Sequence, residues 1–224
     1  MTIEEFRAEY EAEMLRYDSP YLPKPHGIAR GIFHNYRPWE YWKMMQYGEF
    51  KEGDLVLDCG AMHTYFCLYL AKRVDWVFST DSFYWAHRDY MKKEKLLSPG
   101  DWSNFIEEAR SNVTAEEADL CNLKYNNESF DKIVCISVIE HVFLDMIAFG
   151  EMLRILKPGG RLLITTEYDP KTPKTYSEDD GSYYRIYDPG GLRYLVQHPD
   201  LDVLVIEEEN SNARGNAFIC GVKR

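Results

Sequence analysis

From residue 54 onward, short apolar runs alternate with helix-like stretches along most of the chain. Five runs have the length of strands: 54–58, 76–80, 112–118, 132–136 and 161–166. Between them, apolar residues recur at helical spacing, most clearly from Leu144 to Ile155. Buried strands that alternate with helices are typical of a parallel sheet covered by helices on both faces. The pattern therefore predicts an α/β fold.

The N-terminal part of the chain departs from this alternation. Residues 3–17 have an amphipathic helical pattern, and a second helix is predicted from Pro38. No run in this part has the pattern of a buried strand. We therefore expect residues 1–50 to be a helical extension on the substrate side of an α/β domain at 51–224.

The C-terminal third also departs from the alternation. Residues 169–190 are polar, rich in turn formers and too long for a plain connector, which predicts an insertion on the substrate side. Two final β-rich runs, 203–206 and 217–222, have no helix between them. They predict an antiparallel strand pair at the edge of the sheet.

Charge and cysteine content exclude several classes of function. The net charge of −11 argues against a protein that binds nucleic acid through its phosphates. No apolar stretch approaches membrane-spanning length, and five cysteines without a C-x-x-C pair indicate a reducing compartment. We expect a cytoplasmic protein with no nucleic-acid or membrane partner and no metal site. The oligomeric state stays open, with a homodimer as one option.

Two acids end neighbouring apolar runs. Asp58 is followed by Cys59 and Gly60 after the first run, and Asp81 ends the second. A strand, a glycine turn, a helix and a strand that ends in a carboxylate are typical of proteins that bind an adenine nucleotide or nucleoside. The turn lets backbone N–H groups approach the ligand, and the carboxylate accepts hydrogen bonds from ribose hydroxyls. The alternative for Asp81 is a helix N-cap.

Four segments in order resemble the class I S-adenosylmethionine-dependent methyltransferases, over about residues 50–222. They are 55–60 (LVLDCG), Asp81, 117–120 (EADL) with 130–134 (FDKIV), and 137–142 (SVIEHV) through 153–160 (LRILKPGG). The resemblance implies a Rossmann-like, seven-stranded, mostly parallel sheet that has helices on both faces and an antiparallel C-terminal strand pair. It also implies S-adenosyl-L-methionine as the cofactor.

By this resemblance, Asp81 would bind the ribose, Asp119 the adenine amine, and Gly60 would let the backbone pass close to the amino-acid tail. Asp58 would orient the loop or meet the ammonium group through water, and the Ser137 carbonyl would face the amino group or the methyl group. The full expected cofactor set is Asp58, Gly60, Ala61, Met62, Thr64, Asp81, Ser82, Asp119, Leu120 and Ser137. For Asp119, a solvated turn is the alternative.

The glycine motif is incomplete. The family usually has three glycines at alternate positions, whereas Met62 and Thr64 follow Gly60 here and His63 lies between them. Three interpretations compete: a reshaped loop that still lines a working site, weak cofactor binding, or a non-methylating relative. The first is favoured because the other motifs are intact.

Catalytic candidates lie beyond the fourth strand. Methyl transfer needs a positioned nucleophile and, for a hydroxyl, a base. His141 is the first candidate for the base, with Glu140 as its orienting partner and His34 as the second choice; capping of the next helix is the alternative for the Glu140–His141 pair. The expected acceptor contacts are Tyr36, His141, Tyr183, Tyr184 and Arg185. For the last three, a surface loop is the alternative.

The sequence therefore predicts a methyltransferase that acts on the O, N or C of a small organic metabolite. Abundant aromatic residues, including 17 Tyr, fit either an aromatic-walled acceptor pocket or extra packing surface. A non-catalytic binding or regulatory module with a degenerate glycine motif is the alternative. A nucleotide-binding oxidoreductase fits less well, because the tract from Leu153 to Gly160 and the antiparallel ending do not belong to that fold. The sequence does not identify the acceptor or the methylated atom.

Overall fold

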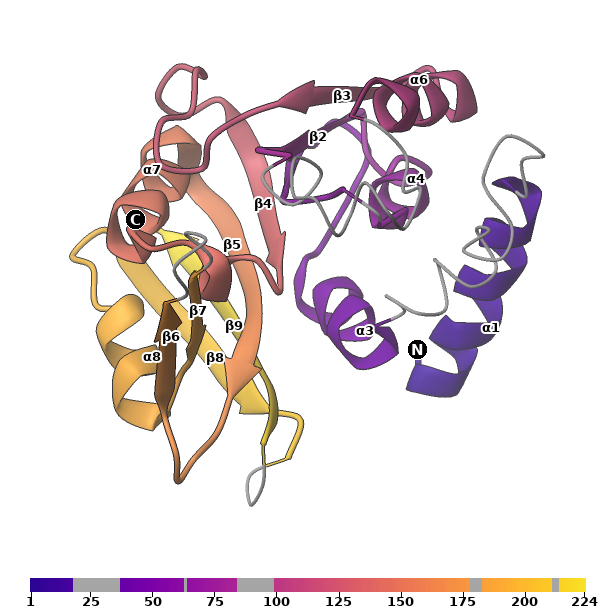
Figure 1. Ribbon diagram of the computed structural model, residues 1–224. Coiled ribbons are helices and arrows are strands. Elements are labelled where there is room, and N and C mark those ends of the chain that lie inside the picture. Colours follow the sequence, from indigo (N-terminus) through magenta and orange to yellow (C-terminus); the bar gives the residue numbers. More distant parts are fainter. Residues whose placement is uncertain (18–36, 63, 84–98, 178–182, 211–213) are drawn as a thin grey trace. The chain divides into compact units, whose positions relative to one another are not determined.

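The computed structural model describes residues 1–17, 37–62, 64–83, 99–177, 183–210 and 214–224. The chain divides into two compact units, 1–118 and 119–224. Seven strands form one sheet in the order β3-β2-β1-β4-β5-β9-β8 (Figure 1). This order and the antiparallel last pair confirm the expected seven-stranded, mostly parallel α/β fold.

Three parallel strands form the centre of unit one. They are β1 (Leu55–Cys59), β2 (Trp76–Asp81) and β3 (Val113–Glu117). Helix α4 (Phe66–Leu70) follows β1 with all five residues buried, and α6 (Pro99–Ala109) packs against β3. Strand β1 carries apolar residues without alternation and is buried on both faces, as the pattern predicted, whereas β3 at the edge of the sheet alternates between buried and half-buried residues.

An aromatic cluster holds the N-terminal helices together in unit one. Helix α1 (Ile3–Met14) continues into a 3-10 turn, η1 (Leu15–Tyr17), and α3 (Pro38–Tyr47) begins at the proline expected for a first turn. Tyr10 has its ring centre 5.4 Å from that of Tyr41 and 5.3 Å from that of Tyr69. Part of the aromatic content is therefore packing surface, which was one of the two interpretations. With 12 residues α1 is the longest described helix, and no helix in the described ranges is long and apolar enough to cross a membrane.

A buried carboxylate attaches α1 to the rest of unit one. Glu13 is only 2% exposed and accepts hydrogen bonds from Lys72 (2.8 Å), Arg110 (3.1 Å) and the Tyr17 hydroxyl (3.0 Å). Burial alone would raise the pKa of Glu13, but the hydrogen bonds from Lys72 and Tyr17 outweigh it and the net pKa is lowered. The ionised form is therefore the one that stabilises the folded chain.

Replacing Glu13 with glutamine is expected to lower the free energy of unfolding by about 1–2 kcal/mol at pH 7, because the buried acceptor loses its charge. Since a lowered pKa stabilises only above that pKa, the difference from the wild type should shrink as the pH falls below about 5. Urea titrations of both proteins at pH 7 and below about pH 5 measure this difference in the free energy of unfolding. Glu11→Gln on the same helix is the control, and equal effects of the two substitutions would refute the attachment.

Unit two contains the other four strands of the sheet. Strands β4 (Phe130–Ile136) and β5 (Leu156–Tyr168) are parallel, and β9 (Gly215–Lys223) runs antiparallel to both β5 and β8 (Leu201–Glu208). The sequence pattern placed the fifth strand at 161–166 and a stop before it. The strand is longer because Leu156 pairs with Phe130 ahead of a register shift, so pairing begins before the glycines.

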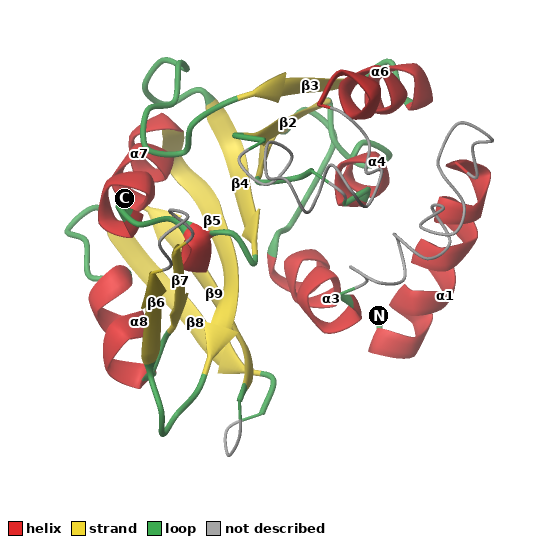
Figure 2. Cartoon of the chain, viewed as in Figure 1, coloured by secondary structure: helices red, strands yellow, loops and turns green. Residues whose placement is uncertain are grey.

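Residues 169–190, which the sequence pattern predicted as an insertion, contain a small β-hairpin. Strands β6 (Lys174–Ser177) and β7 (Tyr183–Ile186) pair antiparallel in a separate two-stranded sheet (Figure 2). Helix α8 (Pro189–Leu195) follows and is capped by the Asp188 carboxylate, which accepts a hydrogen bond from the Gly191 N–H (2.6 Å). The sequence did not predict these strands, since their polar residues give no alternating pattern.

Candidate functional site

The loop after β1 is a tight turn fastened to β2. Gly60 has φ of 68°, a left-handed conformation that favours glycine, so this one motif glycine is required by the backbone. The Ala61 N–H donates to the Thr80 carbonyl (2.9 Å), and both the N–H and the hydroxyl of Thr64 donate to the Ala61 carbonyl (3.0 and 2.9 Å). The Thr64 hydroxyl is therefore used within the loop. His63 lies outside the described residues.

Asp81 joins this loop to the end of β2. One carboxylate oxygen accepts the Met62 N–H (3.1 Å) and the other accepts the Phe83 N–H (2.6 Å). Burial raises the pKa of Asp81, and the two amide hydrogen bonds act against that rise. The carboxylate is thus held rigidly at the carboxyl end of its strand. Ser82 is exposed beside it. The N-cap alternative for Asp81 needs a helix that begins at Phe83, and the residues that would continue this helix, 84–98, lie outside the described part of the chain.

Met62 is largely buried, with 8% of its surface exposed. Its backbone, rather than its side chain, provides the contact with Asp81. The loop therefore has a compact geometry with one glycine in place of three. This geometry fits the interpretation of a reshaped loop.

Asp58 is a buried acid with an unsatisfied oxygen. It is 1% exposed, and its Oδ2 has no hydrogen-bond partner among the described residues. Burial, followed by the nearby charge of Asp81, raises the pKa of Asp58 to about 8. A carboxylate oxygen in this position is suited to receive a cationic or hydrogen-bond-donating group.

The other expected cofactor residues lie in unit two. Asp119 is exposed, and its Oδ1 accepts the Cys121 N–H (2.8 Å), so it forms a local turn, which was the alternative for this residue. Leu120 is half-buried beside it. Ser137 follows β4 with φ of 50°, and its N–H donates to the Thr165 carbonyl (3.0 Å). A non-glycine residue with a positive φ has a strained backbone, and such strained residues are often found near ligand sites.

Glu140 and His141 lie in a short 3-10 helix, η3 (Ile139–His141). Glu140 is 1% exposed and accepts a hydrogen bond from the Thr166 hydroxyl (3.2 Å). The His141 ring lies 5.1 Å from the Tyr184 ring of β7, between ring centres. Helix α7 (Asp145–Ile155) begins later, and its cap residue Leu144 makes no side-chain capping bond. The structure therefore does not show Glu140 or His141 capping that helix.

The hairpin is fixed to the start of α7 by residues that the sequence did not single out. Asp145 is 6% exposed, forms an ion pair with Arg185 and accepts the Tyr187 hydroxyl hydrogen bond (2.8 Å). Burial, followed by the charge of Asp145, raises the pKa of Tyr187, which keeps its hydroxyl protonated as a donor. In the sequence Asp145 is only a first-turn acid, so no signal marked its role.

Neighbouring residues of β7 have different partners. The Tyr184 hydroxyl accepts a hydrogen bond from Arg214 (3.0 Å), which also pairs with Glu167 (2.7 Å). Tyr183 is 7% exposed, and its ring meets the ring of Phe143 edge-on. Unit two thus brings His141 and Tyr184 together, whereas Tyr183 and Arg185 have other partners. His34 and Tyr36 lie outside the described residues.

Sequence comparison matches most of the region that contains these motifs to a known protein family. The profile of the family described as "Methyltransferase domain" matches residues 57–164. A ubiquinone/menaquinone biosynthesis C-methyltransferase UbiE from Bdellovibrio bacteriovorus is 28% identical over 137 residues, which cover 61% of this chain and 52% of that protein. The chain spans about half the length of the curated relatives it matches.

Solved structures share the fold at low identity. The 1,6-didemethyltoxoflavin-N1-methyltransferase of Burkholderia thailandensis has a TM-score of 0.65 and 15% identity, covering 100% of this chain and 91% of that one. The [4+2]-cyclase SpnF has a TM-score of 0.64 and 15% identity, covering 82% and 80%. Together with the profile match, these findings confirm the resemblance to class I S-adenosylmethionine-dependent methyltransferases: residues 57–164 match the methyltransferase-domain family, and the solved structures share the fold.

Proposed function

We propose that this protein transfers a methyl group from S-adenosyl-L-methionine to the O, N or C of a small organic molecule. One observation carries the proposal: the Asp81 carboxylate at the end of β2 accepts a hydrogen bond from the Met62 N–H in the loop after β1. Both residues lie inside the matched domain. Carboxylates at this strand end bind ribose hydroxyls in related nucleoside-binding folds.

The residues of unit one suit the cofactor chemically. The free lone pairs of Asp81 would accept the ribose hydroxyls, and Gly60 keeps side-chain atoms away from the turn. The unsatisfied oxygen of Asp58 would receive the ammonium group of the amino-acid tail, directly or through water. When bound, the cofactor supplies an electrophilic methyl group on a sulfonium, which needs little activation. The adenine role of Asp119 and the role of Ser137 rest on their motifs.

His141 is the proposed base for an acceptor that loses a proton. Its ring is positioned against Tyr184, and the neighbouring Glu140 is buried and held by Thr166. Tyr183 and Arg185 alternate with Tyr184 along β7, so they are proposed as acceptor contacts from the sequence alone, as is Tyr36. His34 is the second candidate for the base, also from the sequence alone. By their names, the relatives methylate carbon and nitrogen, which supports a small organic acceptor without choosing the atom.

A non-catalytic binding module is the second candidate. Two motif glycines are replaced, and Met62 is buried in the loop. Calorimetric titration with S-adenosylmethionine and S-adenosylhomocysteine separates the two functions. Binding with a dissociation constant in the range of about 1–100 μM supports the enzyme, whereas no binding at about 1 mM supports the module.

Replacing Asp81 with alanine is expected to weaken cofactor binding about 5–150-fold, because a charged hydrogen-bond acceptor for the ribose and for two loop amides is lost. Calorimetry of the folded variant measures the effect. Asp75→Ala, an exposed acid just before the same strand, is the matched control and should bind normally. An unchanged affinity in Asp81→Ala would show that the ribose binds elsewhere.

A further inference from the structure

Unit two contains a small pocket beside the hairpin. Its volume is about 250 Å³. The walls come from β6, β7, α8 and the start of α7, and the lining residues are Asp145, Met146, Pro173, Lys174, Thr175, Arg185, Ile186, Tyr187, Asp188, Gly191, Tyr194 and Leu195. Ligand sites usually enclose roughly 300–1,000 Å³, so an occupant of this pocket has to be small.

This pocket is separate from the contact between His141 and Tyr184. Successive side chains of a strand point to opposite faces, so Arg185 and Tyr184 lie on different faces of β7. Accordingly Tyr184 contacts His141, while Arg185 and the following Tyr187 bind Asp145. Of the described residues assigned to the acceptor, only Arg185 borders the pocket.

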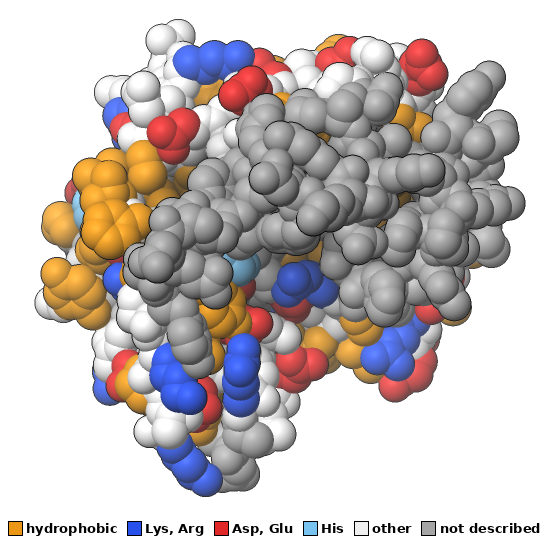
Figure 3. Space-filling model, viewed as in Figure 1, with side chains coloured by type: hydrophobic (Ala, Val, Ile, Leu, Met, Phe, Trp, Pro, Cys, Tyr) orange, Lys and Arg blue, Asp and Glu red, His pale blue; other side chains and the backbone are white. Residues whose placement is uncertain are grey.

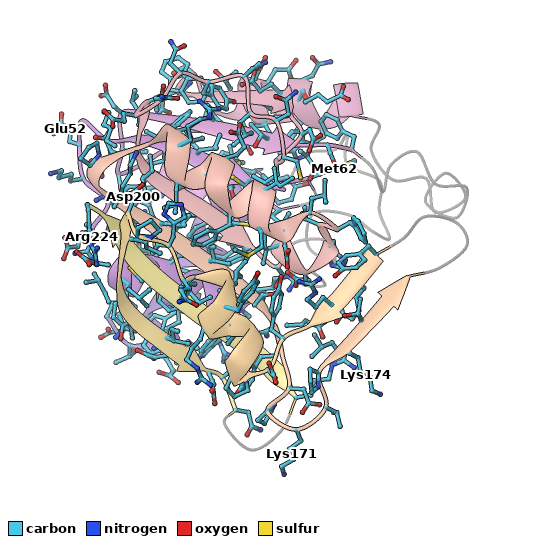
Figure 4. All side chains as sticks on the ribbon, turned by 90° about the vertical axis from the view of Figure 1, so that its left-hand side faces the viewer. Glu52, Met62, Lys171, Lys174, Asp200 and Arg224 are labelled. Carbon is cyan, nitrogen blue, oxygen red and sulfur yellow. The ribbon has the colours of Figure 1, made fainter. Side chains whose placement is uncertain are left out.

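Two opposite charges at the pocket do not pair with each other. Lys174 is exposed and forms no ion pair with any described residue; Figure 4 shows it on the outer edge of the hairpin. Asp188 uses one oxygen to cap α8 through the Gly191 N–H and also forms no ion pair within the described ranges. Cationic side chains gather over the hairpin region in Figure 3, although the chain as a whole is acidic.

The remaining charged groups at the pocket are already satisfied or partly used. Asp145 accepts hydrogen bonds from its neighbour Met146, from Tyr187 and from Arg185. Arg185 also lies over the rings of Tyr183 and Tyr187, at 5.4 and 5.6 Å from their centres, which restricts its movement. Among the described residues, the charged groups of the pocket that have no ion-pair partner are therefore the Lys174 ammonium group and one Asp188 oxygen, beside the exposed ring of Tyr194.

We propose that this pocket binds a free α-amino acid with an apolar or aromatic side chain. The ligand carboxylate pairs with Lys174, and its ammonium group pairs with Asp188. Its side chain packs against the exposed ring of Tyr194 and against Met146. A zwitterion satisfies both unpaired charges at once, whereas an anion or a cation leaves one of them unmatched.

Titration with three probes of similar shape tests this proposal on the full chain. The probes are L-phenylalanine, 3-phenylpropanoate (which lacks the ammonium group) and 2-phenylethylamine (which lacks the carboxylate). L-phenylalanine is expected to bind about tenfold more tightly than either of the others, as judged by calorimetry or ligand-observed NMR. Saturating S-adenosylhomocysteine is present throughout, so that the cofactor tail site cannot account for the binding.

Two substitutions that keep the fold identify the site. Asp188→Asn retains the N-cap, since asparagine caps as well as aspartate, and should weaken L-phenylalanine and 2-phenylethylamine about three- to tenfold but not 3-phenylpropanoate. Lys174→Met keeps the apolar stem and should weaken L-phenylalanine and 3-phenylpropanoate instead. This crossed pattern would support the site.

Three results would overturn the proposal. They are no L-phenylalanine binding at about 20 mM, equal affinity for all three probes, and affinities that neither substitution changes. The outcome is independent of methyl transfer, because a chain that fails to bind S-adenosylmethionine would still contain this pocket.

Discussion

Replacing His141 with glutamine is expected to lower kcat for methyl transfer about 10²–10⁴-fold and to leave the affinity for S-adenosylmethionine unchanged, because the proposed base is lost while the cofactor contacts remain. The prediction applies to an acceptor whose nucleophile loses a proton. Single-turnover rates with an active acceptor, together with calorimetry of cofactor binding, measure the two effects separately.

Two controls show whether the loss belongs to proton transfer. His198→Gln changes a histidine in the turn before β8, whose ring accepts the Asp200 N–H, and should retain full activity. In His141→Gly, added imidazole should restore part of the lost rate. If His141→Gln kept the wild-type kcat across the pH range, His141 would not be the base. The same would follow if added imidazole did not restore any of the rate that His141→Gly loses.

Replacing Asp58 with asparagine is expected to abolish a fall in stability that the wild type shows as the pH rises. The ordinary pKa of the carboxyl group is 3.8, and burial together with Asp81 raises it to about 8 in the fold. Between these values the folded chain holds one proton more than the unfolded chain, so the free energy of unfolding decreases with increasing pH. From pH 6 to pH 8 this amounts to about 2 kcal/mol.

The pH dependence of stability can be attributed to Asp58, because the cysteine and the tyrosine next to it do not change their charge over this pH range. The titratable groups that face Asp58 are Asp81 on β2, Cys67 on α4 and Tyr41 on α3. Burial raises the pKa of both Cys67 and Tyr41, so these two groups stay neutral over the range. Urea titrations from pH 6 to 8 compare the slopes of the wild type, Asp58→Asn and the exposed control Asp75→Asn. An identical slope in wild type and Asp58→Asn would show that Asp58 is ionised throughout.

Local signals were sufficient for most of the fold. Apolar runs such as Ile133–Ile136 have no polar position that could face water, so they had to be interior strands, and Pro38 began a helix as expected. The hairpin was missed because β6 and β7 lack alternation. They are held instead by distant partners, with Arg185 and Tyr187 bound to Asp145, and such partners have no fixed spacing in the sequence.

The sequence by itself determined the α/β class, the antiparallel ending, the resemblance to a methyltransferase family and the position of the two strand-end acids, because these depend on periodicity and on short motifs. Only the tertiary structure decided that Met62 contacts Asp81 through its backbone, that Asp58 keeps an oxygen without a partner, and that Tyr184 rather than Tyr183 lies against His141. These features depend on burial and on contacts between segments far apart in the chain, which local sequence patterns do not encode.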